Sequence, residues 1–349
     1  MHLALHWQPN GHTGWGVCGT ELALAFLRLG HTVTFPHGVH GATLAPWDVR
    51  LLHPVLSQPR KPADLDLYPL GNGLQPYPPQ PGGIGLAFVE DTASVTPGAT
   101  NGMRAVLGGS AWCHRLLGGN AGVFQQGVDT SLFCPGPKPK LLGATGPVVF
   151  SGGKLEWRKG QDIVIQTFKR LLAVYPDALL LTAWQNPWPQ TVQGFATLPT
   201  STEPAALTAW LVAQGIPAAN HVEIGKAPHH TLPYYLRCAD VALFPNRCEG
   251  GTNLVAMEAM ACGIPTILSN GTGHLDIAGY RINGRPVAPA HGYGGTEGWV
   301  ECEPEELALG LRYLLGETSL PVPSWRHGLT MAELTWERTA TQILDAATT

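Results

Sequence analysis

The chain has 349 residues, of which 44% are hydrophobic and 13% are charged, and its formal net charge is −4. This length predicts two domains that each bury a core, and the slightly acidic balance excludes a general attraction to nucleic acid or anionic membranes. Seven scattered cysteines without a CxxC pair favour reduced thiols, and no signal peptide or membrane-spanning run is visible, so we expect a cytoplasmic protein.

The first part of the chain predicts strands and helices in alternation. Apolar runs indicate strands at residues 2–7, 33–35 and 84–89, and residues 49–52 are a further candidate strand. Apolar spacing indicates a helix at residues 21–29, closed by Gly30, and residues 105–117 are expected to include another helix. The Pro- and Gly-rich residues 68–83 predict an irregular loop.

The same pattern restarts after the Pro-rich residues 135–139. Strands are expected at residues 148–151, 178–182, 222–224, 241–244 and 266–269, and helices at residues 161–174, 205–214, 230–238 and 254–262. Alternation of this kind indicates an α/β architecture, in which helices wind parallel sheets. We therefore predict two Rossmann-like domains, with ligands at the carboxyl ends of their strands.

The most informative segment is residues 245–276, in which two carboxylates surround the start of a helix. Glu249 precedes a glycine pair, and Glu258 lies inside an otherwise apolar helix, where an unpaired charge is costly. Free N–H groups at a helix start suit a phosphate, whereas carboxylates suit the neutral hydroxyls of a sugar or ribose. The candidate phosphate-binding residues are Gly250, Gly251, Thr252 and Asn253. The alternative is a buried strand–loop–helix unit in which a neighbouring Arg satisfies Glu258.

The run Glu258-Ala-Met-Ala-Cys-Gly-Ile-Pro265, together with Glu249, resembles the nucleotide-sugar site of retaining glycosyltransferases of the GT-B fold, family 4. This family is also called glycosyl transferases group 1. The resemblance implies two Rossmann-like domains that face each other across a cleft. It also implies that Glu249 contacts the donor sugar and Glu258 the ribose. The spacing departs from the family, because eight residues separate the two glutamates here and the family has seven.

A basic segment, residues 150–162, extends the resemblance. It contains Gly153-Lys154-Leu155 followed by Lys159-Gly160, and the family carries two basic residues at these places. In the family these residues reach the donor diphosphate, which implies that role for Lys154 and Lys159, with Arg158 as a further contributor. Cations stabilise a departing diphosphate because negative charge develops on it. A solvated basic turn is the alternative interpretation.

Residues 14–19 match GxGxxG between a strand and a helix. A dinucleotide site would also need an acid at the end of the second strand, and the nearest downstream acid is the more distant Asp48. We therefore expect no nicotinamide or flavin cofactor. The turn looks more like the glycine-rich turn of GT-B enzymes, which implies donor contacts at Gly14 and Gly16. A tight turn without a ligand is the alternative.

Two acidic residues differ from the family pattern, and a pair of histidines is a candidate metal site. Many members place a histidine after the middle strand of the first domain, whereas here Glu90 follows that strand and is expected to face the acceptor hydroxyl. An N-cap or a surface acid is the alternative for Glu90. Asp276 stands in place of the usual glutamate after residue 269. The neighbours His229 and His230 rarely converge on one ion, so no metal is expected.

The resemblance also sets the expected domain organisation. Residues 1–134 form an acceptor-side domain, residues 135–142 a linker, and residues 143–325 a nucleotide-sugar-binding domain. Residues 326–349 contain a terminal helix that crosses back to the first domain. Closure of the two domains around the donor is expected at the linker.

The function implied is that of a glycosyltransferase that moves a hexose from a UDP- or GDP-sugar to a hydroxyl acceptor, with retention at the anomeric carbon. The sugar nucleotide is a co-substrate, and no cofactor is expected. The acceptor is a glycan, lipid, peptide or small molecule that the sequence does not identify, and a lipid acceptor would bring peripheral membrane contact. Two alternatives stay open: a sugar-nucleotide epimerase on the same fold, and a catalytically silent binding or scaffold protein.

Overall fold

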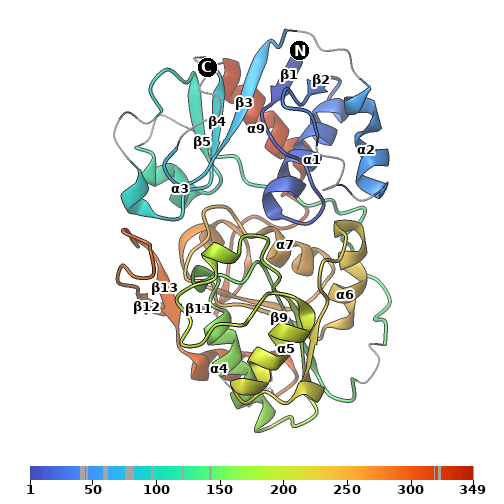
Figure 1. Ribbon diagram of the computed structural model, residues 1–349, viewed down its shortest axis with the longest axis vertical. Helices are drawn as coiled ribbons and strands as arrows, with labels where there is room; N and C mark the ends of the chain where they lie inside the picture. Colours follow the sequence, from blue (N-terminus) through green and yellow to red (C-terminus); the bar gives the residue numbers. More distant parts are fainter. Residues whose placement is uncertain are drawn as a thin grey trace.

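The computed structural model describes residues 1–39, 44, 46–57, 62–74, 82–95, 98, 100–118, 122–140, 144–317, 319–320 and 324–348, with the side chain of Asp48 outside this description. These residues form two lobes, one above the other along the long axis (Figure 1). Each lobe is built on its own sheet, with the strand orders β2-β1-β3-β4-β5 and β14-β11-β10-β9-β6-β7-β8. The predicted α/β architecture with two parallel-sheet domains is therefore confirmed.

The first lobe is a parallel sheet with helices packed on it. Its strands are β1 (His2–Leu5), β2 (Thr32–Thr34), β3 (Leu65–Leu70), β4 (Ile84–Ala87) and β5 (Ala105–Gly108). Its helices are α1 (Gly14–Arg28), α2 (Pro46–Leu56) and α3 (Ala111–Leu116). Apolar side chains of β1, α1 and α2 share one buried cluster, so the first lobe has its own core.

The second lobe repeats the plan with more elements. Its strands are β6 (Val148–Gly152), β7 (Leu179–Ala183), β8 (His221–Glu223), β9 (Val241–Phe244), β10 (Thr266–Ser269), β11 (Gly279–Ile282) and the antiparallel edge strand β14 (Ser324–Arg326). Its helices are α4 (Gln161–Leu172), α5 (Pro204–Ala213), α6 (Leu232–Cys238), α7 (Leu254–Ala261) and α8 (Pro304–Leu314). A separate antiparallel pair joins β12 (Gly284–Pro286) to β13 (Val300–Cys302).

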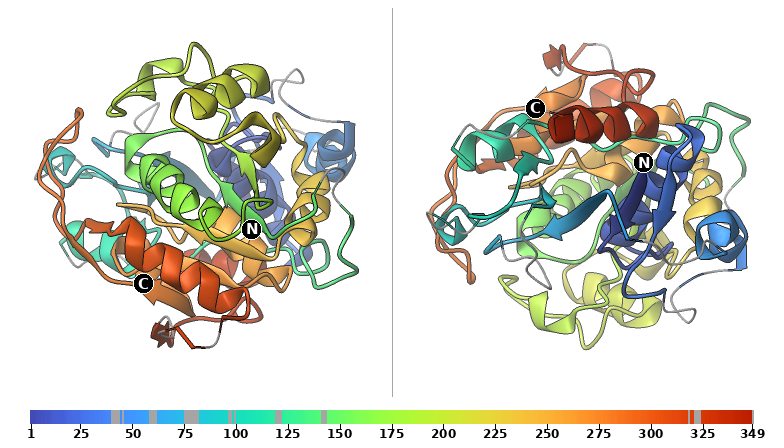
Figure 2. Two further views of the ribbon diagram at one scale, coloured as in Figure 1. Left: turned by 90° about the horizontal axis from the view of Figure 1, so that it is seen from below. Right: turned by 90° about the horizontal axis from the view of Figure 1, so that it is seen from above.

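The last helix, α9 (Trp336–Thr348), lies in the first lobe although the second lobe precedes it in the chain (Figures 1 and 2). Trp336 and Ile343 belong to the same buried cluster as α1. The hydroxyl of Thr339 donates a hydrogen bond to the backbone oxygen of Gln125, at 2.6 Å. The chain therefore crosses between the lobes twice.

Several local predictions were wrong, each for a physical reason. Residues 49–52 belong to helix α2, in which Leu52 and Val55 are buried at a spacing of three, as on a helix face. The loop predicted from residue 68 overlaps strand β3, whose Tyr68 and Leu70 are buried despite the proline between them. Residues 75–81 of that predicted loop lie outside the described residues. Helix α1 begins at Gly14, seven residues before its predicted start, so the glycine-rich turn is the first turn of the helix.

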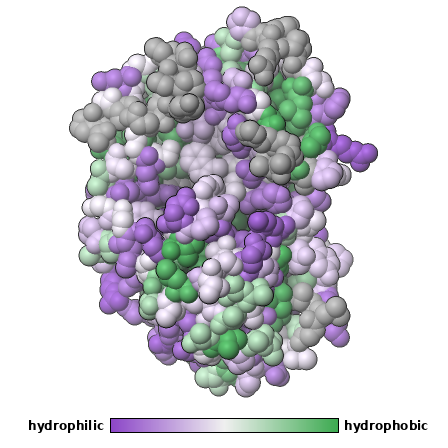
Figure 3. All heavy atoms as spheres, in the orientation of Figure 1, coloured by the Kyte–Doolittle hydropathy of each residue, from purple (hydrophilic) through white to green (hydrophobic). Residues whose placement is uncertain are grey.

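On the face drawn in Figure 3, hydrophobic residues gather in small groups that polar residues separate. Within the described ranges, none of the helices is long and apolar enough to cross a membrane.

Candidate functional site

A charged cluster lies at the carboxyl ends of two neighbouring strands of the second lobe, β6 and β9. The basic segment that begins at Gly153 follows β6, and Glu249 follows β9. The carboxyl ends of parallel strands share one edge of a sheet, so these segments meet although about a hundred residues separate them. Gly153 has a φ of +108°, which a residue with a side chain rarely adopts, so the turn out of β6 depends on glycine.

Arg158 is the centre of this cluster and is only 3% exposed. Its Nη2 lies 2.7 Å from Oε1 of Glu90, and its Nη1 lies 3.4 Å from Oε2 of Glu249. Its Nε also lies 2.8 Å from Oε2 of Glu156, as an ion pair without hydrogen-bond geometry. One guanidinium thus holds three carboxylates, and one of them, Glu90, comes from the first lobe.

Lys159 and Glu249 form a second buried ion pair beside Arg158, with Nζ and Oε1 at 2.5 Å. The amide of Asn246 donates to the same carboxylate oxygen. Burial alone would raise the pKa of Glu249, but Lys159 and Arg158 outweigh it and bring the pKa to about 2. Burial lowers the pKa of Lys159, although Glu249 opposes the shift. Glu249 is therefore an ionised acceptor, and a new anion would compete with it for Lys159.

Lys154 stands at the rim of the cluster. Its side chain is 27% exposed, its Nζ lies 3.2 Å from Oε2 of Glu156, and it lies 5.2 Å from the ring centroid of Trp188. The structure therefore brings Lys159 and Arg158 to Glu249 and leaves Lys154 beside Glu156. Lys154 reaches the same group of charges through that shared carboxylate.

Glu90 follows strand β4 and reaches into the second lobe from the first. Burial raises the pKa of Glu90 in spite of the nearby Arg158, and the negative charge of Glu156 adds to the shift. Glu90 and Glu249 therefore differ in proton affinity within one site. Such a difference separates a carboxylate that stays charged from one that takes up a proton more readily.

The loop from Gly250 to Asn253 is buried between the lobes. A Cβ atom on Gly250 would lie 2.6 Å from the backbone oxygen of Val89, and one on Gly251 would lie 2.7 Å from Oε1 of Gln126. The glycine pair is therefore needed for close approach to the first lobe. The hydroxyl of Ser110 donates to the backbone oxygen of Gly250 at 2.9 Å, so a direct hydrogen bond also joins the lobes here.

The start of helix α7 carries an unsatisfied polar group. Asn253, with φ +70°, caps the helix by accepting a hydrogen bond from the backbone N–H of Ala256. The Thr252 hydroxyl is fully buried and has no hydrogen-bond partner among the described residues. An orphaned buried hydroxyl is costly, so a ligand oxygen that reached it at the start of α7 would be stabilised.

Glu258 is paired with a histidine, whereas the alternative interpretation of the sequence named an arginine. Its carboxylate oxygen Oε1 lies 2.5 Å from Nε2 of His229, and Glu258 is 3% exposed. The backbone N–H of His229 also donates to the oxygen of Gly11, at 3.2 Å, across the boundary between the lobes. His229 is therefore the missed residue that joins Glu258 to the first lobe.

Gly14 and Gly16 lie in the first turn of α1, which points toward the start of α7. Thr13 caps α1 by accepting a hydrogen bond from the N–H of Gly16. A Cβ atom on Gly14 would lie 3.9 Å from Cδ1 of Leu254, the first residue of α7, and one on Gly16 would clash with Asn10. The two helix starts thus face each other across the boundary between the lobes.

Other hydrogen bonds hold the lobes together around the cluster. The carboxylate of Asp276 accepts bonds from the backbone N–H of Ala111 and from Nε2 of Gln125, at 2.8 and 3.2 Å. Asp91 accepts a bond from the N–H of Gly295 at 2.7 Å. Asp276, noted in the sequence for its unusual place, is therefore a contact between the lobes.

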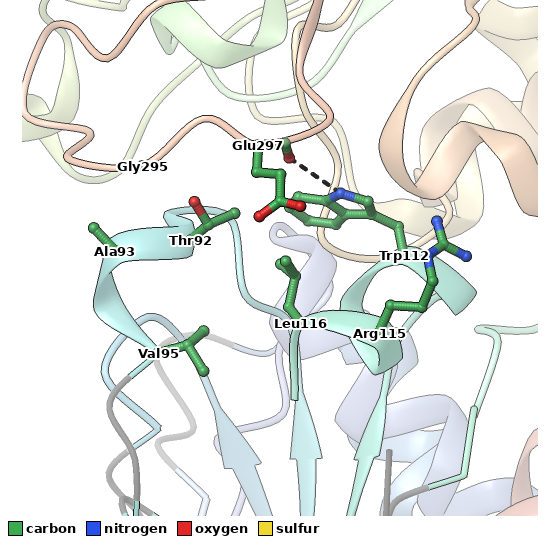
Figure 4. A pocket seen from close by; sticks show the side chains of 8 residues that line it. All are labelled: Thr92, Ala93, Val95, Trp112, Arg115, Leu116, Gly295 and Glu297. Atoms are coloured by element: carbon green, nitrogen blue, oxygen red, sulfur yellow. Dashed lines mark hydrogen bonds between the residues drawn. The ribbon is translucent and has the colours of Figure 1, made fainter. Parts of the chain in front are cut away.

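A cavity lies on each side of this contact region. The larger one, of about 460 Å³, opens between the segment after β4, helix α3 and the loop before β13 (Figure 4). Leu116 and Glu297 project into it, while Trp112 donates from its indole to the backbone oxygen of Glu297 at 3.2 Å. The smaller one, of about 310 Å³, lies between α1, α2 and His229.

Sequence reasoning missed Glu156, His229 and Arg247. Glu156 lies between Lys154 and Arg158 in the sequence, so its pairing with these cations could have been predicted. Arg247 binds Asp162 through two nitrogens at 2.7 and 2.8 Å, and its guanidinium lies over the ring of Trp157. Both partners belong to the basic segment, so Arg247 holds that segment in place. No pattern along the chain indicates the pairing of Arg247 with Asp162. A search of the described ranges finds no group of three or more His, Cys, Asp or Glu side chains placed to hold a metal ion.

Two Rossmann-like lobes that face each other, with a site at the carboxyl ends of their strands, define the GT-B class of fold. Residues 137–291 match the family Glycosyl transferases group 1. This match includes the basic segment, Glu249 and Glu258.

Similar proteins carry related names. A GDP-mannose-dependent alpha-(1-6)-phosphatidylinositol monomannoside mannosyltransferase of Mycolicibacterium smegmatis is 31% identical over 160 residues, which are 42% of this chain and 37% of that protein. A D-inositol 3-phosphate glycosyltransferase of Jonesia denitrificans is 30% identical over 239 residues, 64% of this chain and 50% of that protein. The chain thus spans half or less of the length of these relatives.

Solved structures resemble the whole chain in fold. AviGT4, a glycosyltransferase involved in avilamycin A biosynthesis, has a TM-score of 0.60 at 16% identity, covering 100% of this chain and 97% of its own. Anabaena HepE in complex with UDP-glucose has a TM-score of 0.61 at 14% identity, covering 99% and 94%. These likenesses confirm the predicted GT-B fold.

Proposed function

We propose that the protein is a retaining glycosyltransferase that transfers a hexose from a UDP- or GDP-sugar to a hydroxyl acceptor. The observation that carries this proposal is the buried group of Lys159, Arg158 and Glu249, together with the orphaned hydroxyl of Thr252 three residues further along the chain from Glu249. It combines cations for a diphosphate with a carboxylate for sugar hydroxyls. The names of the relatives, and the UDP-glucose bound to HepE, support the same class of donor.

Lys159 is the main cation for the diphosphate in this proposal. Its Nζ is held by Glu249 in the structure, and a diphosphate placed at the start of α7 would take over part of that interaction. The Thr252 hydroxyl would donate to a phosphate oxygen, and the helix start at Gly14 and Gly16 would face the diphosphate from the first lobe. Lys154 and Arg158 add positive charge, which grows in value as the departing diphosphate gains negative charge.

Each of the three carboxylates would bind a different hydroxyl group of the substrates. Glu249 stays ionised and accepts hydrogen bonds from hydroxyls of the donor sugar, and Glu258 accepts them from the ribose. Glu90 would accept a hydrogen bond from the attacking hydroxyl of the acceptor, since its raised pKa suits an exchange of protons. The leaving diphosphate is a second acceptor for that proton.

The acceptor would enter from the larger cavity, whose lining begins two residues after Glu90, at Thr92. We place the reaction in the cytoplasm, in line with seven free cysteines, six of them buried. Contact with a membrane surface would come through the acceptor if the acceptor is a lipid.

The test is incubation of the purified protein with UDP-, GDP- and ADP-hexoses, with and without candidate hydroxyl acceptors. Release of free nucleoside diphosphate, faster with an acceptor, supports a transferase, and NMR of the product reports retention at the anomeric carbon. Formation of a new sugar nucleotide would identify an epimerase instead. No change in any donor, at enzyme concentrations where the donor binds, would identify a binding or scaffold protein.

A further inference from the structure

Two buried residues next to the candidate site have a backbone conformation that is costly for their residue types. Thr272 has a φ of +46° and is 1% exposed, and Asn253 has a φ of +70° and is 6% exposed. The left-handed region is unfavourable for a side chain branched at Cβ, such as threonine, whereas asparagine tolerates it better. Strained residues persist where the surrounding contacts hold them, and they gather at functional sites, so the contacts of these two residues matter for the site.

The residues after β10 hold the backbone of Glu249. The hydroxyl oxygen of Thr272 accepts a hydrogen bond from the backbone N–H of Glu249 at 2.9 Å, and the N–H of Gly273 donates to the backbone oxygen of Glu249 at 3.0 Å. A Cβ atom on Gly273 would lie 1.6 Å from the backbone oxygen of Gly251, so only glycine allows this approach. The two segments are therefore in direct backbone contact at Glu249 and Gly251.

His274 extends the same contact to the start of α7. Its ring is fully buried, with Nε2 at 3.2 Å from Nδ2 of Asn253 and Nδ1 at 3.0 Å from the hydroxyl oxygen of Ser269. Ser269 donates its single hydroxyl proton to the backbone oxygen of Asn246 at 2.5 Å, so it accepts a bond from the Nδ1–H of His274. Burial lowers the pKa of His274 to about 4, so near pH 7 the ring is neutral and Nε2 accepts from the amide of Asn253.

The hydrogen bond to His274 fixes the direction in which the Asn253 amide points. With Nδ2 of Asn253 turned toward His274, Oδ1 faces the N–H of Ala256 at 3.3 Å and caps α7. Thr252, whose buried hydroxyl has no partner among the described residues, directly precedes this cap. A change at His274 would therefore reach the start of α7 through Asn253.

Three consecutive residues, Thr272 to His274, thus contact every second residue of the loop at 249–253, in the same order along the chain. We call these three residues the brace. The loop contains one residue more than the family has between Glu249 and Glu258, so more conformations are lost when it is ordered. Contacts at both ends and in the middle of the loop remove that freedom before a donor binds.

We propose that Thr272 and His274 are positioning residues of the donor site, an inference that rests on the proposed function. Both act through neighbours. Thr272 sets the backbone of Glu249, whereas His274 sets the amide of Asn253 and with it the N–H groups at the start of α7. The brace thus forms the place for the diphosphate in advance, and a site formed in advance binds more tightly because less freedom is lost on binding.

The experiment compares two substitutions of His274 that each keep one of its hydrogen bonds. In His274→Gln the new amide takes the place of Nε2 and accepts from Asn253, whereas in His274→Asn it takes the place of Nδ1 and reaches only Ser269. Titration calorimetry uses whichever of UDP and GDP binds the wild type more tightly. We expect binding within twofold of wild type for His274→Gln and roughly three- to tenfold weaker binding for His274→Asn, the worth of one ordinary hydrogen bond.

Urea unfolding of the same variants separates positioning from stability. Each of the two His274 variants loses one hydrogen bond of the ring, so their unfolding free energies should fall by similar amounts, and a purely structural role would weaken nucleotide binding equally in both. His327→Asn, at an exposed histidine of the second lobe, is the matched control and should bind the nucleotide as the wild type does.

A second pair of variants tests the other end of the brace. Thr272→Ser keeps the hydroxyl that accepts from the N–H of Glu249, and it should bind the nucleotide within twofold of wild type. Thr272→Ala removes that acceptor and should bind roughly three- to tenfold more weakly. This pair also decides the inference if the His274 variants do not fold.

The outcomes separate this inference from the proposed function. If UDP or GDP binds the wild type but the two variants at a position bind it equally, the positioning role of that residue is refuted and the donor site stands. Weaker binding by His274→Gln than by His274→Asn would refute the role of the bond to Asn253 in the same way. If neither UDP nor GDP binds the wild type, both proposals fail.

Discussion

The two lysines of the basic segment allow a matched test, because they differ in burial and in partners. In Lys159→Ala, the buried carboxylate of Glu249 loses the cation at 2.5 Å and keeps Arg158 at 3.4 Å. Breaking a buried ion pair typically costs 3–5 kcal/mol, and the remaining Arg158 should reduce this to about 1–3 kcal/mol of unfolding free energy. Lys154 is a partly exposed ion-pair partner at 3.2 Å, so Lys154→Ala should cost about 1 kcal/mol or less.

The effect on catalysis should differ from the effect on stability. Both lysines are proposed to face the diphosphate in the closed site, so each alanine variant should lose roughly 2–4 kcal/mol of transition-state stabilisation, measured as kcat/KM for the donor. Urea unfolding measures stability in parallel, and Lys140→Ala, in the segment between the lobes, serves as the control. Kinetics within twofold of wild type for both Lys154→Ala and Lys159→Ala would refute the diphosphate assignment. Equal stability of the two variants would refute the account of the buried pair.

Three other predictions concern the carboxylates and the lobes. Glu258→Gln should mainly raise the donor KM, because a ribose contact is the same in ground and transition states. Glu249→Gln should lower kcat more than it raises KM. A Glu249→Gln variant with full kcat would show that Glu249 does not contact the donor sugar. Burial raises the pKa of Glu21 to about 7, so the folded state binds its proton more tightly and loses stability as the pH rises through about 4.5 to 7. Glu21→Gln should therefore gain up to about 3 kcal/mol in unfolding free energy at pH 8 and less than about 1 kcal/mol at pH 5, as urea titrations at both values would show. The radius of gyration in solution scattering should fall when a nucleoside diphosphate saturates the protein, and an unchanged radius would contradict closure of the lobes.

The sequence predicted the second lobe better than the first. Strands such as β6, β9 and β10 are short, fully buried apolar runs, and clear helix signals separate them. Strand β3 was hidden because it contains Pro69 and runs into a Pro-rich segment. Helix α2 was mistaken for a strand because Val49 and Leu52 resemble a short apolar run, and the exposure of Val49 is a property of the folded lobe.

The parts of the candidate site that lie close together in sequence were predictable. The motif around Glu249 and the basic segment could be matched residue by residue, and the alternating pattern led us to expect ligands at the carboxyl ends of the strands. The partners of Glu258 and Glu90 could not be predicted, because His229 and Arg158 come from distant elements. The orphaned hydroxyl of Thr252 is likewise visible only when the packing around it is known.

The central claim is that the diphosphate of a sugar nucleotide binds between Lys159 and the start of α7. A crystal structure of the protein with the preferred nucleoside diphosphate would test it most directly. The claim predicts phosphate oxygens within about 3.2 Å of Nζ of Lys159 and of the Thr252 hydroxyl, with the Lys159–Glu249 pair loosened. A nucleotide bound elsewhere, with that ion pair intact and the Thr252 hydroxyl still without a partner, would contradict it.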